Sequence, residues 1–460
     1  MRNPDVLLDA KLRSQDRFVW ENTDREEFRE LYENTLSSNY FVVTYKTFEG
    51  DVETRSETLR IMIGRDGEIL GWDHHVPDSR PGDELTEDEA RRIAERSIEE
   101  QFDLSLDELV PVKVVPEKLN DRKDWQFIYR KTQEELDEGY IRYTATIAGS
   151  DLSALRSDVH ISESWERERK KENTKQVILS AISTVIQFGL LITIVIMGII
   201  AWTHKRFHVR VFLWFLGGFF LLSLLQTLLL SNALFAQYPT SEPFSNLLII
   251  FIISALIGSI FSAFLYAIPA GYMAQLPLPL YRNEEQVWIK GTSLGLLFAA
   301  FLAFVNSAVF KDVPQRISPA EIDSLLPALS SLFGSAETYL MMLIRLLVPF
   351  VLVRRLSSAW RKNKIQALII LFVSGFMFVG KLPLQWWLLN GAIFGMLMIG
   401  LYLLVIRYNM IYIPVMAAVV ILLDTLRYAI TGSGGFYGGT CCYYRRRHDI
   451  SGSAYHRGDA

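Results

Sequence analysis

The chain has 460 residues, of which half are hydrophobic and 21% are charged, and this is too much charge for a protein that lies wholly in lipid. Residues 1–175 hold 41 acidic and 27 basic residues (net −14), and the remainder holds 10 and 20 (net +10), which sums to the overall −4. The acidic first part excludes nucleic acid as a partner, because that would require clustered basic charge. The two cysteines, Cys441 and Cys442, are adjacent and exclude a disulfide framework.

The first part of the chain alternates helical and strand patterns. Thr-x-x-Glu sequences beginning at Thr23 and Thr86 have the spacing of a capping box and predict that a helix starts at each. Segments rich in β-branched and aromatic residues predict strands at 39–48, 57–64, 68–72, 109–115, 124–131 and 140–149. Arg65-Asp66-Gly67 predicts a hairpin turn. We therefore predict an α+β domain over residues 1–165 and a charged linker over 166–176.

Long apolar runs dominate the rest of the chain, and most reach the ~20 residues that cross a bilayer core. They cover residues 177–202, 211–236, 246–273, 292–310, 337–356, 365–380, 384–406 and 411–430. Because 365–380 is short and 337–356 contains Arg345, seven to nine spans are compatible with the pattern. We predict an all-α polytopic membrane bundle of about eight helices over residues 177–430, embedded in a lipid bilayer. Residues 431–460 are expected to form a disordered or atypical tail.

Loop charges predict the orientation of the spans, because cytoplasmic loops are enriched in Lys and Arg. With eight spans, eleven basic residues fall on one side and three on the other. The N-terminal domain then lies on the side with three, which predicts a cell-membrane protein with an extracytoplasmic domain. The basic cluster just before the first span, from Arg167 to Lys175, argues the other way, and the first 20 residues contain no signal peptide. Either the domain is cytoplasmic, or the true N-terminus lies upstream.

The arrangement of these segments resembles a known family. LTEDEARRIAERSIEEQFDLSLDELVPVKVV (85–115), followed by DWQFIYRK, resembles a PepSY-like unit, in which a helix after an acidic cap leads into strands. With the hairpin RDGEILGWDHHVPD, the strand DLSALRSDVHI, the linker SWERERKKEN and the bundle, the chain resembles extended bacterial members of the CPBP family, intramembrane metalloproteases related to type II CAAX prenyl endopeptidases. The resemblance implies that the domain regulates the bundle or binds a peptide or membrane-protein partner.

The catalytic motifs of that family are degenerate in this chain. The family uses Glu-Glu-x-x-x-Arg, Phe-x-x-x-His and a third histidine-containing helix around a metal-activated water. The counterparts here are SAETYLMMLIRLL with Glu337 and Arg345, FMFVGK without a histidine, and IPVMAAVVILLD ending in Asp424. None of the seven histidines lies in a predicted span, and HExxH is absent. The resemblance therefore implies a pseudoprotease without a cofactor, with Glu337, Arg345 and Asp424 as remnants of the catalytic site.

Several alternatives remain open for these charges and for the function. Charged groups in spans need a partner or a water-filled cavity, so Glu337, Arg345 and Asp424 belong either to a site or, as we favour, to a structural ion-pair network. If Glu337, Lys381, Ala417 and Asp424 converged in the structure, they would identify the former catalytic site that the family resemblance implies. One alternative function is an active zinc metalloendopeptidase built on Glu337 and Asp424. The other is a non-enzymatic transporter component or membrane sensor.

Three further patterns concern helix packing. Ser254, Gly258 and Ser262 form one stripe of small residues, and Gly391-x-x-x-Gly395 forms a second, both of which predict close helix contact. Pro269-Ala270-Gly271 predicts a kink or an end in the third span. Asp424 and Arg427, three residues apart, predict an ion pair in the last span.

Overall fold

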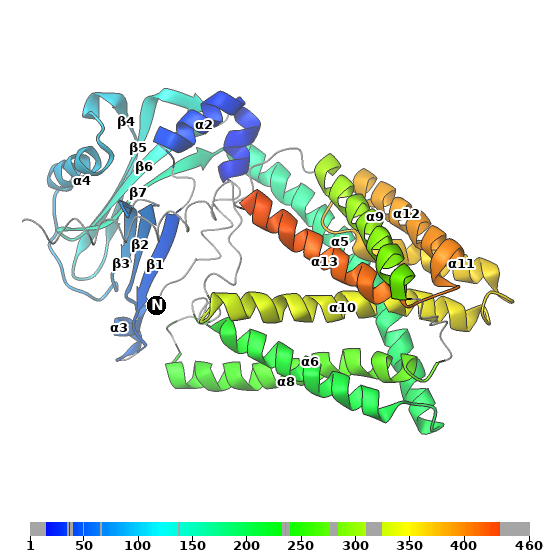
Figure 1. The fold of residues 1–460 in the computed structure, drawn as a ribbon. Helices are drawn as coiled ribbons and strands as arrows, with labels where there is room; N and C mark the ends of the chain where they lie inside the picture. Colours follow the sequence, from blue (N-terminus) through cyan, green and yellow to red (C-terminus); the bar gives the residue numbers. More distant parts are fainter. Residues whose placement is uncertain are drawn as a thin grey trace, which may run out of the picture.

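An antiparallel sheet forms the first part of the chain and long apolar helices form the second in the computed structural model (Figure 1). The structure describes all residues except 1–14, 35, 37–39, 49, 65–66, 137–138, 232–234, 236–239, 241, 277–283, 310–323 and 433–460. The predicted tail therefore lies almost wholly outside the described residues, as do two residues of the predicted hairpin turn, Arg65 and Asp66.

The sheet has seven strands in the order β1-β2-β3-β7-β6-β5-β4, so that β1 and β4 are its two edges. The strands are β1 Tyr40–Lys46, β2 Thr58–Gly64, β3 Ile69–His75, β4 Leu109–Lys118, β5 Lys123–Leu136, β6 Gly139–Ala148 and β7 Asp151–Ile161. All of the strands predicted from composition are present. The antiparallel pairing of β2 with β3 confirms the predicted hairpin. The first hairpin and the last four strands join where β3 pairs with β7, through Trp72 and Leu155.

Short helices flank the sheet, and one of the two predicted capping boxes is correct. The helix α4 (Glu87–Phe102) begins after Thr86, whose amide donates to the Glu89 carboxylate at 3.0 Å. The helix α2 (Arg25–Asn34) begins instead after Asp24, whose carboxylate accepts from two backbone amides at 2.9 Å each. Thr23 was the wrong cap: it follows the helical residues 15–22, and its hydroxyl donates back to the Val19 carbonyl of that helix. Other short elements are the helical residues 15–22, α3 Val52–Ser56 and η1 Leu106–Glu108.

The core of the N-terminal domain lies between α4 and one face of the sheet. Helical spacing places Ala90, Ala94 and Ile98 of α4 on one stripe, and all three are fully buried. They pack in one cluster with inward residues of β5 and β6, such as Phe127 and Tyr143. Full burial of a side chain of this size contributes about 1.5–3 kcal/mol, so this layer supplies much of the stability of the domain.

The second part of the chain is a helical bundle. Its helices are α5 Glu163–Thr203, α6 Val209–Leu229, α8 Phe244–Met273, α9 Glu284–Val309, α10 Pro327–Leu356, α11 Lys364–Gly375 with η3 Phe376–Phe378, α12 Leu384–Leu401 with the π-turn η4 Tyr402–Ile406, and α13 Tyr412–Gly432. Within the described residues, six helices are long and apolar enough to cross a membrane, and α11 and α13 form two shorter apolar segments. The predicted apolar helical bundle is therefore present among the described residues. The predicted number of about eight spans is not confirmed, since six helices are long enough to cross a membrane.

The predicted charged linker, residues 166–176, is helical and belongs to α5. This helix has 41 residues and starts one residue after β7, with Ser162 as its N-cap. At 1.5 Å per residue it is about 60 Å long, roughly twice the thickness of a bilayer core. Its first turns lie beside the sheet and the remainder runs into the bundle (Figure 1). A single helix thus belongs to both parts of the protein.

The small-residue stripes behave differently from each other. Gly391 and Gly395 of α12 lie against α11 and η3, because a Cβ on Gly395 would come within 2.5 Å of the Phe372 carbonyl oxygen. The predicted close contact is confirmed there. On α8 the prediction was wrong by one position, since a Cβ on Gly258 would meet no other part of the protein within 4 Å. The buried stripe of that helix instead consists of Ala255, Ser259 and Ala263.

The third span continues past its proline. Pro269 lies inside α8, which ends at Met273, so an end at Pro269-Ala270-Gly271 would be two to four residues too early. Gly271 allows the connection after α5 to pack closely, because a Cβ there would come within 2.4 Å of the Phe207 ring. The His208 amide donates to the Gly271 carbonyl at 3.1 Å and fixes this corner of the bundle.

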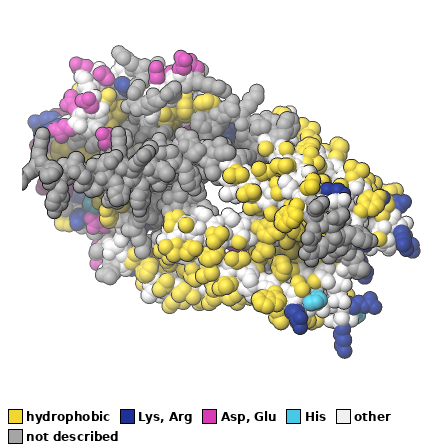
Figure 2. Space-filling model, viewed as in Figure 1, with side chains coloured by type: hydrophobic (Ala, Val, Ile, Leu, Met, Phe, Trp, Pro, Cys, Tyr) yellow, Lys and Arg dark blue, Asp and Glu magenta, His cyan; other side chains and the backbone are white. Residues whose placement is uncertain are grey.

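The surface of the bundle is largely apolar, and its charges lie at the end away from the sheet. Figure 2 shows hydrophobic side chains over the helices, acidic side chains on the N-terminal domain, and Lys and Arg at the opposite end. Exposed basic residues of the α5–α6 and α10–α11 connections include Lys205, Arg206, Arg361 and Lys362. This apolar belt between polar ends is the surface of a multi-pass membrane protein.

Candidate functional site

Three polar side chains and a glycine follow one face of α10 through the interior of the bundle. Ser330, Gly334, Glu337 and Arg345 are separated by four, three and eight residues, a spacing that keeps them on one side of a helix. Ser330 is fully buried, and Glu337 and Arg345 are partly buried. Because polar groups in a membrane interior are costly without partners, their neighbours decide what this stripe does.

The first half of the stripe faces α6. The Ser330 hydroxyl lies 3.5 Å from Oε1 of Gln226, which is itself buried. Gly334 makes room for this side chain, since a Cβ there would come within 3.0 Å of the Gln226 amide nitrogen. One turn further along, the Ser223 side chain of α6 lies close to the Glu337 carboxylate. Ser223 and Gln226, three residues apart on α6, thus match Ser330 and Glu337 on α10.

Tyr266 of α8 connects the two halves of the stripe. Its hydroxyl is close enough to both Arg345 and Glu337 to interact electrostatically with each. Its ring stacks on Phe219 of α6 at 4.9 Å between centroids, which fixes its position. Glu337 and Arg345 are eight residues apart, or about 12 Å along the helix axis, which is too far for an ion pair between them.

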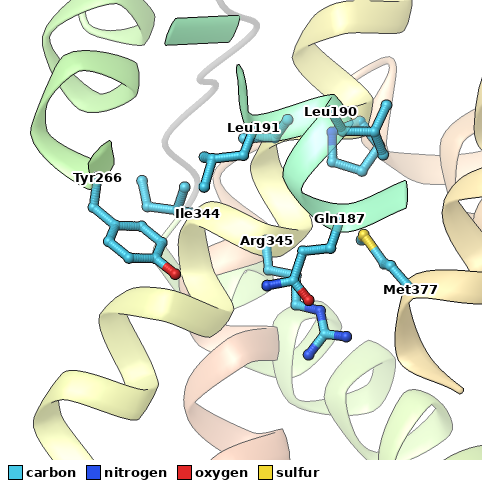
Figure 3. A pocket seen from close by; sticks show the side chains of 9 residues that line it. Gln187, Leu190, Leu191, Tyr266, Ile344, Arg345 and Met377 are labelled. Atoms are coloured by element: carbon cyan, nitrogen blue, oxygen red, sulfur yellow. The ribbon is translucent and has the colours of Figure 1, made fainter. Parts of the chain in front are cut away.

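Arg345 lies beside a small cavity at the centre of the bundle (Figure 3). The cavity has a volume of about 20 Å³, and its polar lining consists of Arg345, Gln187 of α5 and Tyr266. The guanidinium lies 4.8 Å from the centre of the Phe378 ring, a cation–π contact. Among the described residues, Nε of Arg345 is fully buried and has no hydrogen-bond partner. The site therefore contains an incompletely satisfied positive charge.

The structure brings the predicted site residues only partly together. Glu337 and Arg345 share the inner face of α10, as expected, but no ion pair joins them to each other or to Asp424 within the described part of the chain. Asp424 is exposed on α13, and Lys381 is exposed in the turn before α12, whereas Ala417 is fully buried. Of the four positions whose convergence would identify an ancestral site, Ala417 is therefore buried, Glu337 is partly buried, and Lys381 and Asp424 are exposed. The Arg427 side chain lies outside the described residues.

The described residues contain no group of three His, Cys, Asp or Glu side chains placed to hold a metal ion. His204 and His208 lie in the connection between α5 and α6, where the His208 ring caps α6 by accepting from the Val211 amide at 3.3 Å. The segment FMFVGK contributes packing, because the Phe376 ring centre lies 4.7 Å from that of Trp387 and the Phe378 ring lies against the Arg345 guanidinium.

Four residues of this polar stripe were not anticipated from the sequence. Gln187, Ser223, Gln226 and Tyr266 are polar residues within long apolar runs. An amide or a phenol within a span is uncommon enough to indicate a polar contact inside the bundle. The sequence does not show, however, whether such a residue faces α10 or the surface of its span.

Comparison with known proteins gives no relative: no family model, curated protein or solved structure matches the chain. The fold and the site therefore define the class on their own. The chain is a multi-pass membrane protein that carries an extramembrane antiparallel sheet domain on its first spanning helix.

Proposed function

We propose that this protein is a non-catalytic regulatory membrane protein, derived from CPBP-type intramembrane metalloproteases, in which the extramembrane domain controls the helical bundle. The observation that supports it is α5, one unbroken helix shared by the two parts. A flexible linker would isolate the domain from the bundle, whereas a continuous helix transmits rotation and tilt.

The first turns of α5 belong to the core of the N-terminal domain. Trp165 packs edge-to-face against Phe18 at 5.4 Å between ring centroids and contacts the sheet core. Arg169 donates to the Glu21 carboxylate at 2.9 Å and lies 5.5 Å from the Trp165 ring centre. These contacts of Trp165 and Arg169 fix the start of α5 to the N-terminal domain.

The same helix also lines the candidate site. Gln187 borders the cavity beside Arg345, and the Ser183 hydroxyl, one turn earlier, accepts a hydrogen bond from the Trp387 indole at 3.0 Å. A second contact between domain and bundle comes from Phe48, just after β1, which lies 5.4 Å from Phe244 at the start of α8. A ligand that shifts the domain would therefore move two of the helices that line the cavity.

The distribution of charge supports an extracytoplasmic position for the domain. The described basic connections α5–α6 and α10–α11 lie at the end of the bundle away from the sheet (Figure 2). Because Lys and Arg are enriched in cytoplasmic loops, that end is the cytoplasmic one in our proposal. The acidic domain then binds its partner outside the cell membrane, and that partner is a peptide or another membrane protein.

The proposal is tested by loosening the domain end of α5 and observing the cavity. In a background with Cys441→Ser and Cys442→Ser, Leu190→Cys places a reporter on the cavity wall. A Trp165→Ala, Arg169→Ala double substitution in lipid nanodiscs is expected to increase the rate at which a water-soluble maleimide labels Cys at position 190. Arg167→Ala is the control, because Arg167 is exposed and pairs only locally with Glu163.

An unchanged labelling rate in the double variant, despite a lower unfolding temperature of the domain, would refute regulation through α5. A separate assay addresses catalysis. Zinc-dependent cleavage of unfolded peptides by the wild-type protein, lost in Glu337→Gln, would replace the non-catalytic part of the proposal.

A further inference from the structure

The positive charge of Arg345 requires a negative partner that the described chain does not supply. A guanidinium within a membrane bundle is stable only when its charge is compensated and its donors are hydrogen-bonded. The cation–π contact with Phe378 covers one face of the guanidinium plane but accepts none of its N–H groups in the plane. Glu337 lies about 12 Å away along α10, which is too far to compensate the guanidinium directly. The buried Nε therefore remains without an acceptor among the described residues.

The cavity beside this guanidinium contains two more hydrogen-bond donors. The Tyr266 hydroxyl comes from α8 and the Gln187 amide comes from α5, so three different helices contribute a polar group (Figure 3). The rest of the lining is apolar, including Leu190, Leu191 and Met377. A low-dielectric wall strengthens the attraction between a guanidinium and an anion.

The geometry points to a new site: we propose that this cavity binds a small monovalent anionic group, with Arg345 as its counter-ion and with Tyr266 and Gln187 as hydrogen-bond donors. A cation is excluded by the guanidinium charge. A neutral water would satisfy Nε but would leave the charge uncompensated. The volume of about 20 Å³ admits one group close to the size of a water molecule, such as a halide ion, or the end of a carboxylate. This site does not depend on regulation by the N-terminal domain.

The anionic group has two possible sources, which share the same chemistry. A free halide would come from the aqueous phase. The carboxylate of a fatty acid would enter from the lipid, with its acyl chain against the apolar lining. Two experimental arms distinguish these sources.

The first arm measures thermal unfolding of the full chain in nanodiscs as chloride replaces isethionate at constant ionic strength. Isethionate is also monovalent but is larger than the cavity. A ligand that binds only the folded state raises the unfolding temperature saturably with its concentration. We expect this rise in the wild type and in the control Arg355→Gln, which removes an exposed charge from the same helix. Arg345→Gln is expected to abolish it.

A milder variant keeps the test valid if Arg345→Gln does not fold. Tyr266→Phe removes one donor and keeps the ring that stacks on Phe219. A hydrogen bond to a charged group corresponds to about a tenfold change in affinity, so the chloride midpoint should rise about tenfold.

The second arm uses native mass spectrometry of delipidated protein with laurate or with dodecanol, its uncharged analogue. Retention of laurate but not dodecanol, lost in Arg345→Gln, would identify an acyl carboxylate as the ligand. A chloride response without laurate retention would identify a free anion. The proposal is overturned if the wild type shows neither, or if Arg345→Gln and the wild type respond alike in both arms.

Discussion

Insertion of a single alanine after Thr174 tests whether α5 is the rigid connection that its length suggests. Each helical residue adds 100° of rotation and 1.5 Å of rise, so one insertion turns the N-terminal domain by 100° relative to the bundle. A point about 10 Å from the α5 axis, a typical interhelical distance, then moves by about 15 Å. The Phe48–Phe244 contact, at 5.4 Å between ring centroids, cannot survive a movement of that size.

The assay uses Phe48→Cys and Phe244→Cys in the background without native cysteines. A short bifunctional thiol reagent should join these positions efficiently in the parent protein, and the single insertion should reduce the yield to background. Thr174→Ala without insertion serves as the control, because it keeps the helix phase. An insertion of eleven residues restores the rotation to within about 20° but adds about 16 Å of rise, so it should also fail.

A cross-link that forms equally well with and without the insertion would refute the reasoning. It would mean that α5 unwinds between the sheet and the membrane, and that Phe48 and Phe244 hold the two parts together by themselves. The Arg169–Glu21 ion pair is the internal reference, since both residues precede the insertion and should stay paired in either case.

Three further predictions concern stability. Phe127→Ala leaves a cavity in the core under α4 and should lower the free energy of unfolding of the N-terminal domain by about 3–5 kcal/mol, measured in the full chain by chemical denaturation, with Phe127→Leu costing less. Burial holds the pKa of His160 below its ordinary value of 6.5. The contribution of this residue to stability is therefore complete above pH 6.5 and is lost as the pH falls towards the lower folded-state pKa. The free energy of unfolding below pH 6.5 should depend less steeply on pH in His160→Gln. Gly395→Leu should lower the free energy of unfolding in mixed micelles by at least about 1–3 kcal/mol, because its Cβ would meet backbone of α11 at 2.5 Å. Gly400→Leu is the control and should cost little, because a Cβ there has no neighbour within 4 Å. Equal effects would contradict close packing of α11 on α12.

The elements of this fold could be predicted because their periodicity is local. Alternation in β2 and the apolar runs of the bundle mark strands and spans directly, and Thr86 with Glu89 marks the start of α4. The fate of residues 166–176 was harder to predict, because charged residues are compatible with either a linker or a solvated helix. Their side chains form pairs at helical spacing, such as Arg167 with Glu163, and these pairs were the missed signal.

The candidate site could be predicted only in part, because it depends on which helices become neighbours. Glu337 and Arg345 were identified by their charge and by their shared face of α10. Their actual partners, Ser223 and Tyr266, come from helices whose packing no residue of α10 reveals. The stripe on α8 illustrates the same limit: Ser254 with Gly258 and Ala255 with Ser259 have equal spacing, and only the position of α6 and α5 decides which of them is buried.

The edge strand β4 has a consequence for how this protein behaves before it is assembled. Pro111 and Pro116 lack the N–H groups through which another chain could extend the sheet, and the ladder shifts register between Pro111 and Lys113. Exposed Lys113 and Lys118 add positive charge along the same edge. A domain that meets many copies of itself at a crowded membrane surface, while its spans are still being inserted, is thereby protected from polymerising into β-fibres.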